Sequence, residues 1–301
     1  MQAFREHHLS GHDGTPLFAR DVGSGLPLAL CDGIVCDGFI WRYLIRDFRD
    51  RCRLVHSHYR GHGRSSDPAD LDAATLEDVC ADLAAVLDAL DVPSAVLVGH
   101  SMGVQVGLEF YRRHPERVRG LVLICGSYGR ILHTFHSTDI LRWVVPLLGS
   151  AVSRWPRKLQ RLWSMLPVGP AFDMARLLGE VNPALTRRDD LLPYLRHLPR
   201  VSLRLFVTML EDAGRRDAWD LLPLVEVPAL VVAGELDTFT PPYLAEAMAR
   251  RIPGAEYLLV RGGSHVAPIE LPDLVDLRIE KFLLDRVARP GEMGLPARSG
   301  A

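Results

Sequence analysis

Five consecutive residues, Gly99-His100-Ser101-Met102-Gly103, match the pattern G-x-S-x-G directly after an apolar run. The pattern has a chemical use when it lies between a strand and a helix. Glycines two residues before and after the serine let both elements approach closely, so the serine hydroxyl projects over the sheet. The next amide then lies at a helix N-terminus, where negative charge is stabilised. This arrangement predicts that Ser101 is a nucleophile.

A serine hydroxyl needs a base to take its proton and an acid to orient that base. Two later loops supply them, because "GELDTFTP" contains Asp237 and "RGGSHVAP" contains His265, each directly after an apolar run. Sites of open α/β sheets gather at the carboxyl ends of the strands. We therefore predict that Ser101, Asp237 and His265 meet at one sheet edge. Glu235 is a rival acid, but its place nearer the strand suits a salt bridge or a cap.

The elements that position these residues follow from the spacing of apolar side chains. Continuous apolar runs predict strands buried on both faces, over residues 27–33, 52–58, 94–100, 119–126, 228–234 and 255–262. Segments with helical periodicity, such as "TLEDVCADLAAVLDALD" and "GVQVGLEFYRRHPERV", lie between them. This alternation predicts an α/β fold with a mostly parallel sheet.

The alternation stops over residues 127–222, where the pattern is helical only and is cut into short pieces by prolines. A helical insert between two strands explains this better than a structureless loop of that length. The predicted core then comprises residues 1–126 and 223–288. Residues 289–301 are rich in Gly, Pro and Ala, which predicts a disordered tail.

The composition of the 301-residue chain excludes several classes of protein. A formal net charge of −2 gives no reason to expect nucleic acid as a partner. Neither a signal peptide nor an apolar stretch of about 18 residues is present, so we expect a cytoplasmic protein without a membrane span. The five cysteines form no C-x-x-C pair, and no dinucleotide or phosphate-loop motif suggests a cofactor. The oligomeric state is left open.

Five motifs together, "CDG", "YRGHGRSS", "GHSMG", "GELD" and "GGSH", resemble the α/β-hydrolase superfamily from about Leu17 to Leu284. The resemblance implies an α/β-hydrolase fold, with helices flanking the sheet and the insert forming a cap over the site. It supports Asp237 as the acid. Ser101 resembles the serine branch, which argues against haloalkane dehalogenases and epoxide hydrolases, because their mechanism needs an aspartyl ester.

The resemblance also implies an oxyanion hole made by the backbone N–H groups of Met102 and Ile34. Here the chain departs from the family pattern, because Asp32-Gly33 stands where His-Gly is usual. A carboxylate facing an oxyanion would repel it. We therefore expect Asp32 to turn away and bond nearby backbone amides.

Three histidines, His56, His58 and His62, have the look of a metal cluster. The dinuclear-zinc hydrolases that this segment resembles also need an aspartate just before the last histidine, and Gly61 stands there. We therefore predict no metal site.

The insert offers apolar side chains that could bind a substrate, chiefly Trp143, Trp155 and Trp163. The alternative is that these side chains pack on the sheet, which would move the pocket to Ile34, Met102, Tyr128 and Phe239. Neighbouring basic residues leave open an affinity for lipid-like surfaces; they are Arg142, Arg154, Arg157, Lys158 and Arg161.

These observations predict a serine hydrolase that cleaves a carboxylic ester with an apolar part, and whose partner is a small-molecule substrate. Within the same fold, a lactone hydrolase, a carbon–carbon bond hydrolase and a perhydrolase are alternatives. A non-catalytic binding protein is the alternative from another class, although the presence of all three triad residues disfavours it.

Overall fold

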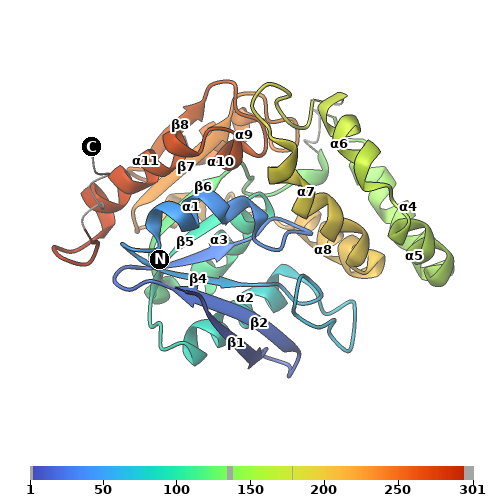
Figure 1. Ribbon diagram of the computed structural model, residues 1–301, viewed down its shortest axis with the longest axis horizontal. Helices are drawn as coiled ribbons and strands as arrows, with labels where there is room; N and C mark the ends of the chain where they lie inside the picture. Colours follow the sequence, from blue (N-terminus) through green and yellow to red (C-terminus); the bar gives the residue numbers. More distant parts are fainter. Residues whose placement is uncertain (1–2, 134–137, 178, 295–301) are drawn as a thin grey trace.

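The computed structural model describes residues 3–133, 138–177 and 179–294. Its strands are β1 (Arg5–Ser10), β2 (Pro16–Val22), β3 (Pro27–Cys31), β4 (Arg53–Ser57), β5 (Ala95–His100), β6 (Val118–Ile124), β7 (Ala229–Gly234) and β8 (Glu256–Val260). They form one eight-stranded sheet in the order β1-β2-β4-β3-β5-β6-β7-β8. The six strands β3 to β8 run parallel, whereas β1 and β2 pair antiparallel. The predicted mostly parallel α/β sheet is confirmed (Figure 1).

Helices cover both faces of the sheet because its central strands are apolar on both sides. Along β5, Val96 and Val98 join a cluster with α1 and α11, whereas Leu97 joins a cluster with α2, α3 and α9. This alternation follows from the two-residue period of a strand. These helices are α1 (Arg42–Phe48), α2 (Leu76–Ala89), α3 (Met102–Arg113), α9 (Pro242–Arg251), α10 (Ala267–Glu270) and α11 (Pro272–Phe282).

The described residues between β6 and β7 form five α-helices: α4 (Leu141–Arg154), α5 (Pro156–Ser164), α6 (Val168–Leu177), α7 (Arg188–His197) and α8 (Leu203–Arg215). Helix α8 connects this segment to the core, because its Leu205 and Met209 pack into the cluster of α2 and α3. Its Val207 packs instead against Val152 of α4. Helices α4 and α5 therefore lie at the outer end of the molecule, attached through α8 (Figure 1).

The predicted strands did not include β1 and β2. Strand β1 lies at the sheet edge, and its side chains are exposed or half-buried, so it lacks the apolar run of a central strand. The buried carboxylate of Asp21 on β2 holds this edge, because it accepts hydrogen bonds from Arg5 and Arg53.

The prediction of a disordered tail from Arg289 is wrong for residues 289–294. The Glu292 carboxylate pairs with Arg119 at 2.6 Å, and the Gly294 N–H donates to the Arg51 carbonyl oxygen. These contacts fix the segment against the core. Residues 295–301 lie outside the described residues. No helix in the described part of the chain has the length and apolar character to cross a membrane.

A buried acid on α11 makes the stability of the fold depend on pH. Burial, and then the neighbouring Asp47 carboxylate, raises the pKa of Asp276 from 3.8 to about 8. The unfolded chain ionises this group at a lower pH than the folded protein does. Below about pH 4 the group is protonated in both states and does not change the free energy of unfolding. As the pH rises from about 4 to about 8, only the unfolded chain ionises it, so the protein loses stability.

We expect Asp276→Asn to raise the free energy of unfolding at about pH 9 by about 3 kcal/mol more than at about pH 4. Asparagine keeps the shape of the side chain and removes its charge. Urea unfolding of both proteins at the two pH values measures this difference. An equal effect of the substitution at both pH values would show that Asp276 is not held protonated.

Candidate active site

Ser101 lies at the tight turn between β5 and α3. Its backbone has φ 56° and ψ −120°, a conformation that side-chain-bearing residues rarely adopt. A Cβ on Gly99 would collide with the backbone of Gly103, and one on Gly103 would collide with the Cys31 carbonyl. Both glycines of the motif are therefore required by close backbone approach, which holds the Ser101 hydroxyl above the sheet.

The structure brings Ser101, His265 and Asp237 into one chain of hydrogen bonds. The Nε2 atom of His265 lies 2.9 Å from Ser101 Oγ, and its Nδ1 atom lies 2.9 Å from Asp237 Oδ2. An ionised carboxylate only accepts hydrogen bonds, so Nδ1 carries the proton and Nε2 is free to accept the serine proton. Asp237 is buried, and the backbone N–H groups of Phe239 and Thr240 also donate to it.

The rival acid Glu235 takes another position. Its Oε2 accepts a hydrogen bond from the Gly262 N–H at 2.8 Å, so it braces the turn that follows β8. The carboxylate next to the histidine ring is therefore that of Asp237.

Two residues that sequence reasoning did not select hold the loop of His265. The buried Glu270 carboxylate accepts hydrogen bonds from the Ser264 hydroxyl and N–H, and also from the backbone N–H of Asn182. His100 Nε2 lies 2.8 Å from the His265 carbonyl oxygen, and burial lowers the pKa of His100 to about 4. His100 is therefore neutral and donates this hydrogen bond.

Two backbone N–H groups beside Ser101 are available for an oxyanion. In the described part of the chain, the N–H groups of Ile34 and Met102 donate to no other group. Met102 begins α3, where the helix leaves such donors unpaired. Ile34 follows Gly33, where a Cβ would come within 3.1 Å of the Ser101 Cβ. Both donors therefore lie next to the hydroxyl.

Asp32 bonds side chains rather than the backbone amides that we expected. Its Oδ1 accepts from Trp41 Nε1 at 2.6 Å, and its Oδ2 lies 2.9 Å from His56 Nε2. Burial is the largest influence and works to raise the pKa of Asp32, but His56, His58 and Trp41 together outweigh it, and the pKa is lowered. The partners of the Asp32 carboxylate are thus Trp41 and His56.

The histidines that resembled a metal cluster have structural partners instead. His58 Nδ1 accepts from the Arg64 N–H, and His62 Nε2 accepts from the Val35 N–H. Burial lowers the pKa of His62 to about 4, so its ring is neutral.

Two cavities meet at Ser101, and both are lined by Ile34, Tyr194 and Phe239. The α7 cavity has a volume of about 160 Å³, and its further lining is chiefly apolar: Cys36, Phe39, Val181, Leu191, Leu195 and Val266. The α4 cavity has a volume of about 330 Å³ and is lined further by Met102, Ile131, Leu141, Val144, Val145, Leu148, Phe206 and Leu210. The site therefore has room for an apolar group on each side of the hydroxyl.

The expected pocket residues Trp143, Trp155 and Trp163 do not line either cavity. Trp143 and Trp155 are 61% and 54% exposed, respectively. The Trp163 ring stacks on Phe206, and its Nε1 donates to a backbone carbonyl. The helical phase explains the error: Leu141, Val144, Val145 and Leu148 share the cavity face of α4, and Trp143 points elsewhere.

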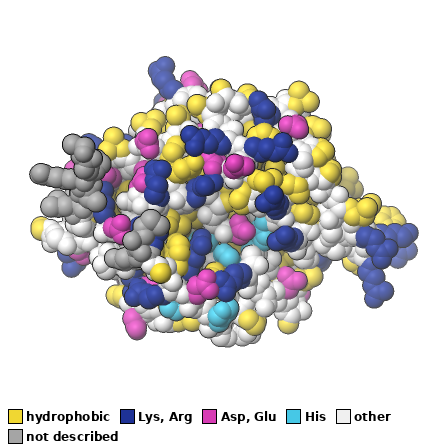
Figure 2. Space-filling view, viewed as in Figure 1, with side chains coloured by type: hydrophobic (Ala, Val, Ile, Leu, Met, Phe, Trp, Pro, Cys, Tyr) yellow, Lys and Arg dark blue, Asp and Glu magenta, His cyan; other side chains and the backbone are white. Residues whose placement is uncertain are grey.

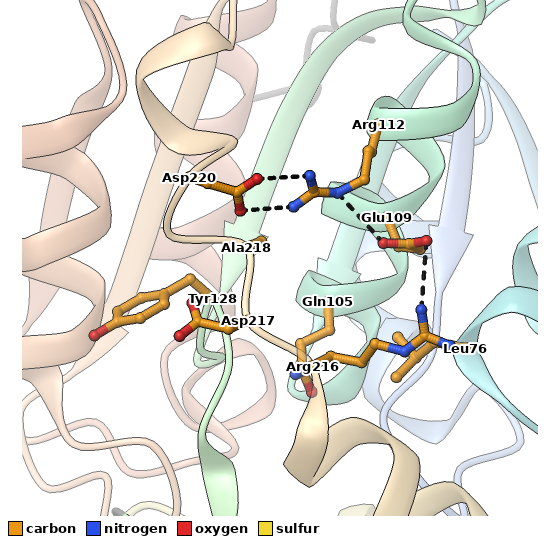
Figure 3. Close-up of a pocket in the computed structure, with 9 residues that line it drawn as sticks. All are labelled: Leu76, Gln105, Glu109, Arg112, Tyr128, Arg216, Asp217, Ala218 and Asp220. Carbon is orange, nitrogen blue, oxygen red and sulfur yellow. Dashed lines mark hydrogen bonds and ion pairs between the residues drawn. The ribbon is translucent and has the colours of Figure 1, made fainter.

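Tyr128 lies in another hollow along α3, which is lined also by Gln105, Glu109 and Arg112 (Figure 3). Its ring packs against Trp219. Charged side chains of this hollow pair with one another, because Arg112 pairs with Asp220 at 2.8 Å and with Glu109 at 3.6 Å (Figure 3). Of the predicted pocket residues, Ile34, Met102 and Phe239 line the cavities at Ser101, whereas Tyr128 does not.

Comparison with protein families gives a match over most of the chain. The model of a family described as alpha/beta hydrolase fold matches residues 27–272. A putative carbamate hydrolase, RutD, from Azorhizobium caulinodans is 28% identical, and the alignment covers 86% of this chain and 91% of that protein. Bifunctional epoxide hydrolase 2 from Rattus norvegicus is 23% identical over 92% of this chain, which spans only 55% of that protein.

Among solved structures, a thermophilic esterase from Thermogutta terrifontis superposes with a TM-score of 0.74. The two proteins are 25% identical, and the match covers 93% of this chain and 98% of the esterase. The similarity therefore includes both the sheet and the helical segment between β6 and β7.

Proposed function

The chain belongs to the α/β-hydrolase fold family, and from this premise we propose that it is a serine hydrolase that cleaves carboxylic esters. The observation that carries the proposal is the chain of hydrogen bonds from Ser101 Oγ through His265 to Asp237. A nucleophile, a base and an orienting acid in this geometry suit acyl transfer.

In the proposed mechanism, Ser101 Oγ attacks the ester carbonyl carbon while His265 Nε2 takes the hydroxyl proton. Asp237 keeps the proton on Nδ1 and stabilises the charged imidazolium. The N–H groups of Ile34 and Met102 donate to the oxyanion. His265 then gives its proton to the leaving alcohol. Water attacks the acyl-serine by the same route, which releases the acid and restores the hydroxyl.

The nature of the nucleophile separates this proposal from the activity named for one relative. The resemblance set out above associates epoxide hydrolysis with an aspartate nucleophile, and the residue on this turn is Ser101. A serine forms an acyl ester with a carbonyl substrate. We therefore assign the chain to acyl transfer rather than to epoxide opening.

We propose that the helical segment of residues 127–222 acts as a cap that selects the substrate. Its helices supply Leu148 and Phe206 to the α4 cavity and Leu191 to the α7 cavity, whereas the triad comes from the loops that follow the strands. Substrate selection and chemistry are thus divided between two parts of the chain. The apolar lining favours esters with apolar acyl or alkyl groups.

Kinetics with purified protein and a matched set of substrates test the reaction class. The set contains acyl esters, a lactone, an aryl carbamate and an epoxide of similar size. We expect the highest kcat/KM for an acyl ester, and we expect that Ser101→Ala does not measurably hydrolyse it. Epoxide opening without ester cleavage would contradict it.

The α4 cavity should limit the chain length of the substrate. We expect Leu148→Trp, which fills part of this cavity, to lower kcat/KM for long-chain esters by about tenfold or more while acetyl esters are cleaved almost as before. Each methylene bound in an apolar pocket contributes about 0.8 kcal/mol. Rates for esters graded separately in acyl and alkyl length measure the effect.

Leu147→Trp is the matched control, because Leu147 is the neighbouring residue on α4 but is exposed and does not line the cavity. It should leave the chain-length profile unchanged. If the chain-length profile were unchanged in both variants, the apolar part of the substrate would bind outside the α4 cavity.

A further inference from the structure

The segment that contains α4 and α5 has an unusual balance of charge for this chain. Between Ile140 and Leu166 there are five basic residues and no Asp or Glu. The whole protein has a formal net charge of −2, so this segment is locally cationic. Figure 2 shows Lys and Arg side chains gathered at the end of the molecule where α5 lies in Figure 1.

Three of these residues form one stripe on α5, and a fourth, Arg154, ends the preceding helix. Arg157, Lys158 and Arg161 follow an i, i+1, i+4 spacing on α5, whereas Arg154 lies before the non-helical residue Trp155. All four are exposed, and within the described residues they form no ion pair. Like charges four residues apart destabilise a helix, and nothing in the described chain offsets this repulsion. The stripe is therefore suited to an external partner that carries negative charge.

Large apolar side chains lie beside the cationic stripe. Leu162 and Met165 are 65% and 71% exposed, and Trp155 is also exposed. The opposite side of α5 faces the molecule, because Gln160 accepts from the Leu203 N–H and Trp163 stacks on Phe206. The basic and apolar side chains thus occupy the outward part of the same helix.

The preceding helix adds to this surface. On α4, Val145, Gly149 and Val152 are buried, whereas Trp143 and Leu147 are exposed. Arg142 stacks over the Trp143 ring, but packing among the described residues buries neither Trp143 nor Leu147. Exposed tryptophan and leucine beside lysine and arginine is the composition of a helix that lies in a membrane interface.

We propose that the α4–α5 surface, formed by Trp143, Leu147, Arg154, Trp155, Arg157, Lys158, Arg161, Leu162 and Met165, binds the headgroup region of an anionic phospholipid bilayer. The basic groups pair with lipid phosphates, and the apolar side chains enter the boundary of the acyl chains. Nucleic acid would use the charges but would leave Leu162 and Met165 in water.

One of the two helices of this surface, α4, also lines the catalytic cavity. Val144 lines the α4 cavity and is itself 44% exposed, between Trp143 and Leu147. A bilayer bound to the α4–α5 surface would thus lie against the helix that forms one wall of the α4 cavity. As a consequence that rests on the proposed function, esters dissolved in an anionic bilayer are the substrates that this surface would present.

Sedimentation of the purified full-length protein with vesicles tests the binding. The protein should bind vesicles that contain phosphatidylglycerol at low salt, bind phosphatidylcholine vesicles weakly, and dissociate as salt is raised. The triple variant Arg157→Gln, Lys158→Gln, Arg161→Gln should reduce partitioning into anionic vesicles by on the order of 100-fold. Leu162→Ser with Met165→Ser should weaken binding to both vesicles.

The matched control is Leu277→Ser with Lys281→Gln on α11, at the opposite end of the molecule (Figure 1). Leu277 has the same 65% exposure as Leu162, and this control should bind as the wild type does. Absence of vesicle binding by the wild type, or equal binding by the triple Gln variant, would overturn the proposal. If the wild type instead bound no vesicles but bound an acidic polypeptide that the triple Gln variant does not bind, that result would overturn the proposal and assign the surface to a protein partner.

Activity separates this inference from the proposed function. The triple Gln variant should cleave a water-soluble acetyl ester at the wild-type rate and lose rate only on an ester embedded in anionic vesicles. Failure of vesicle binding with intact ester hydrolysis would refute the surface alone. Vesicle binding without ester hydrolysis would refute the proposed function alone.

Discussion

Ser101→Ala is expected to lower kcat for ester hydrolysis by about 10⁴-fold or more while the free energy of unfolding changes by less than about 1 kcal/mol. The substitution removes only the Oγ atom, which lies 2.9 Å from His265 Nε2. Alanine keeps the Cβ, so the strained backbone of the turn is the same in both proteins. Steady-state kinetics and urea unfolding of the two proteins measure both effects.

Ser127→Ala is the control for this variant. Ser127 is also buried and follows the neighbouring strand β6, but its Oγ bonds to the backbone of Gly129 rather than to a histidine. Ser127→Ala should change the free energy of unfolding more than it changes kcat. Activity of Ser101→Ala within tenfold of the wild type would exclude Ser101 as the nucleophile.

Asp237→Asn is expected to lower kcat by about 10³-fold, with a smaller effect on KM. An asparagine NH₂ facing His265 Nδ1 would favour the wrong tautomer, in which Nε2 carries the proton and no longer accepts one from Ser101. The variant also loses charge-assisted hydrogen bonds from Phe239 and Thr240, so some loss of stability accompanies it. Kinetics at a temperature where both proteins are folded separates the two effects.

Glu235→Gln provides the comparison that decides between the two acids. Its amide oxygen still accepts from the Gly262 N–H, so the turn keeps its hydrogen bond. This variant should retain nearly the whole of the wild-type kcat. A large loss in Glu235→Gln together with an active Asp237→Asn would reverse the assignment of the acid.

The sequence could predict the positions of Ser101, Asp237 and His265 because each follows its own apolar strand. Strand order did not need to be known, since parallel strands end at the same edge. Strand β1 could not be predicted in the same way, because it is polar, largely exposed and at the sheet edge.

The lining of the site needed information that is not local. Trp143 and Val144 are adjacent in sequence, and only the packing of α4 on α8 decides that Val144 faces the cavity. The partners of Asp32 likewise depend on where Trp41 and His56 pack. A carboxylate that bridges distant loops, as Glu270 does, has no signature in the sequence near it.

Mass spectrometry of the protein after reaction with a fluorophosphonate tests the central claim most directly, because this reagent traps an activated serine as a covalent adduct. The account predicts one adduct per chain on the peptide that contains Ser101, none in Ser101→Ala, and much slower labelling in His265→Ala. Rapid labelling of another residue, or ester hydrolysis by a wild-type protein whose Ser101 is never labelled, would contradict it.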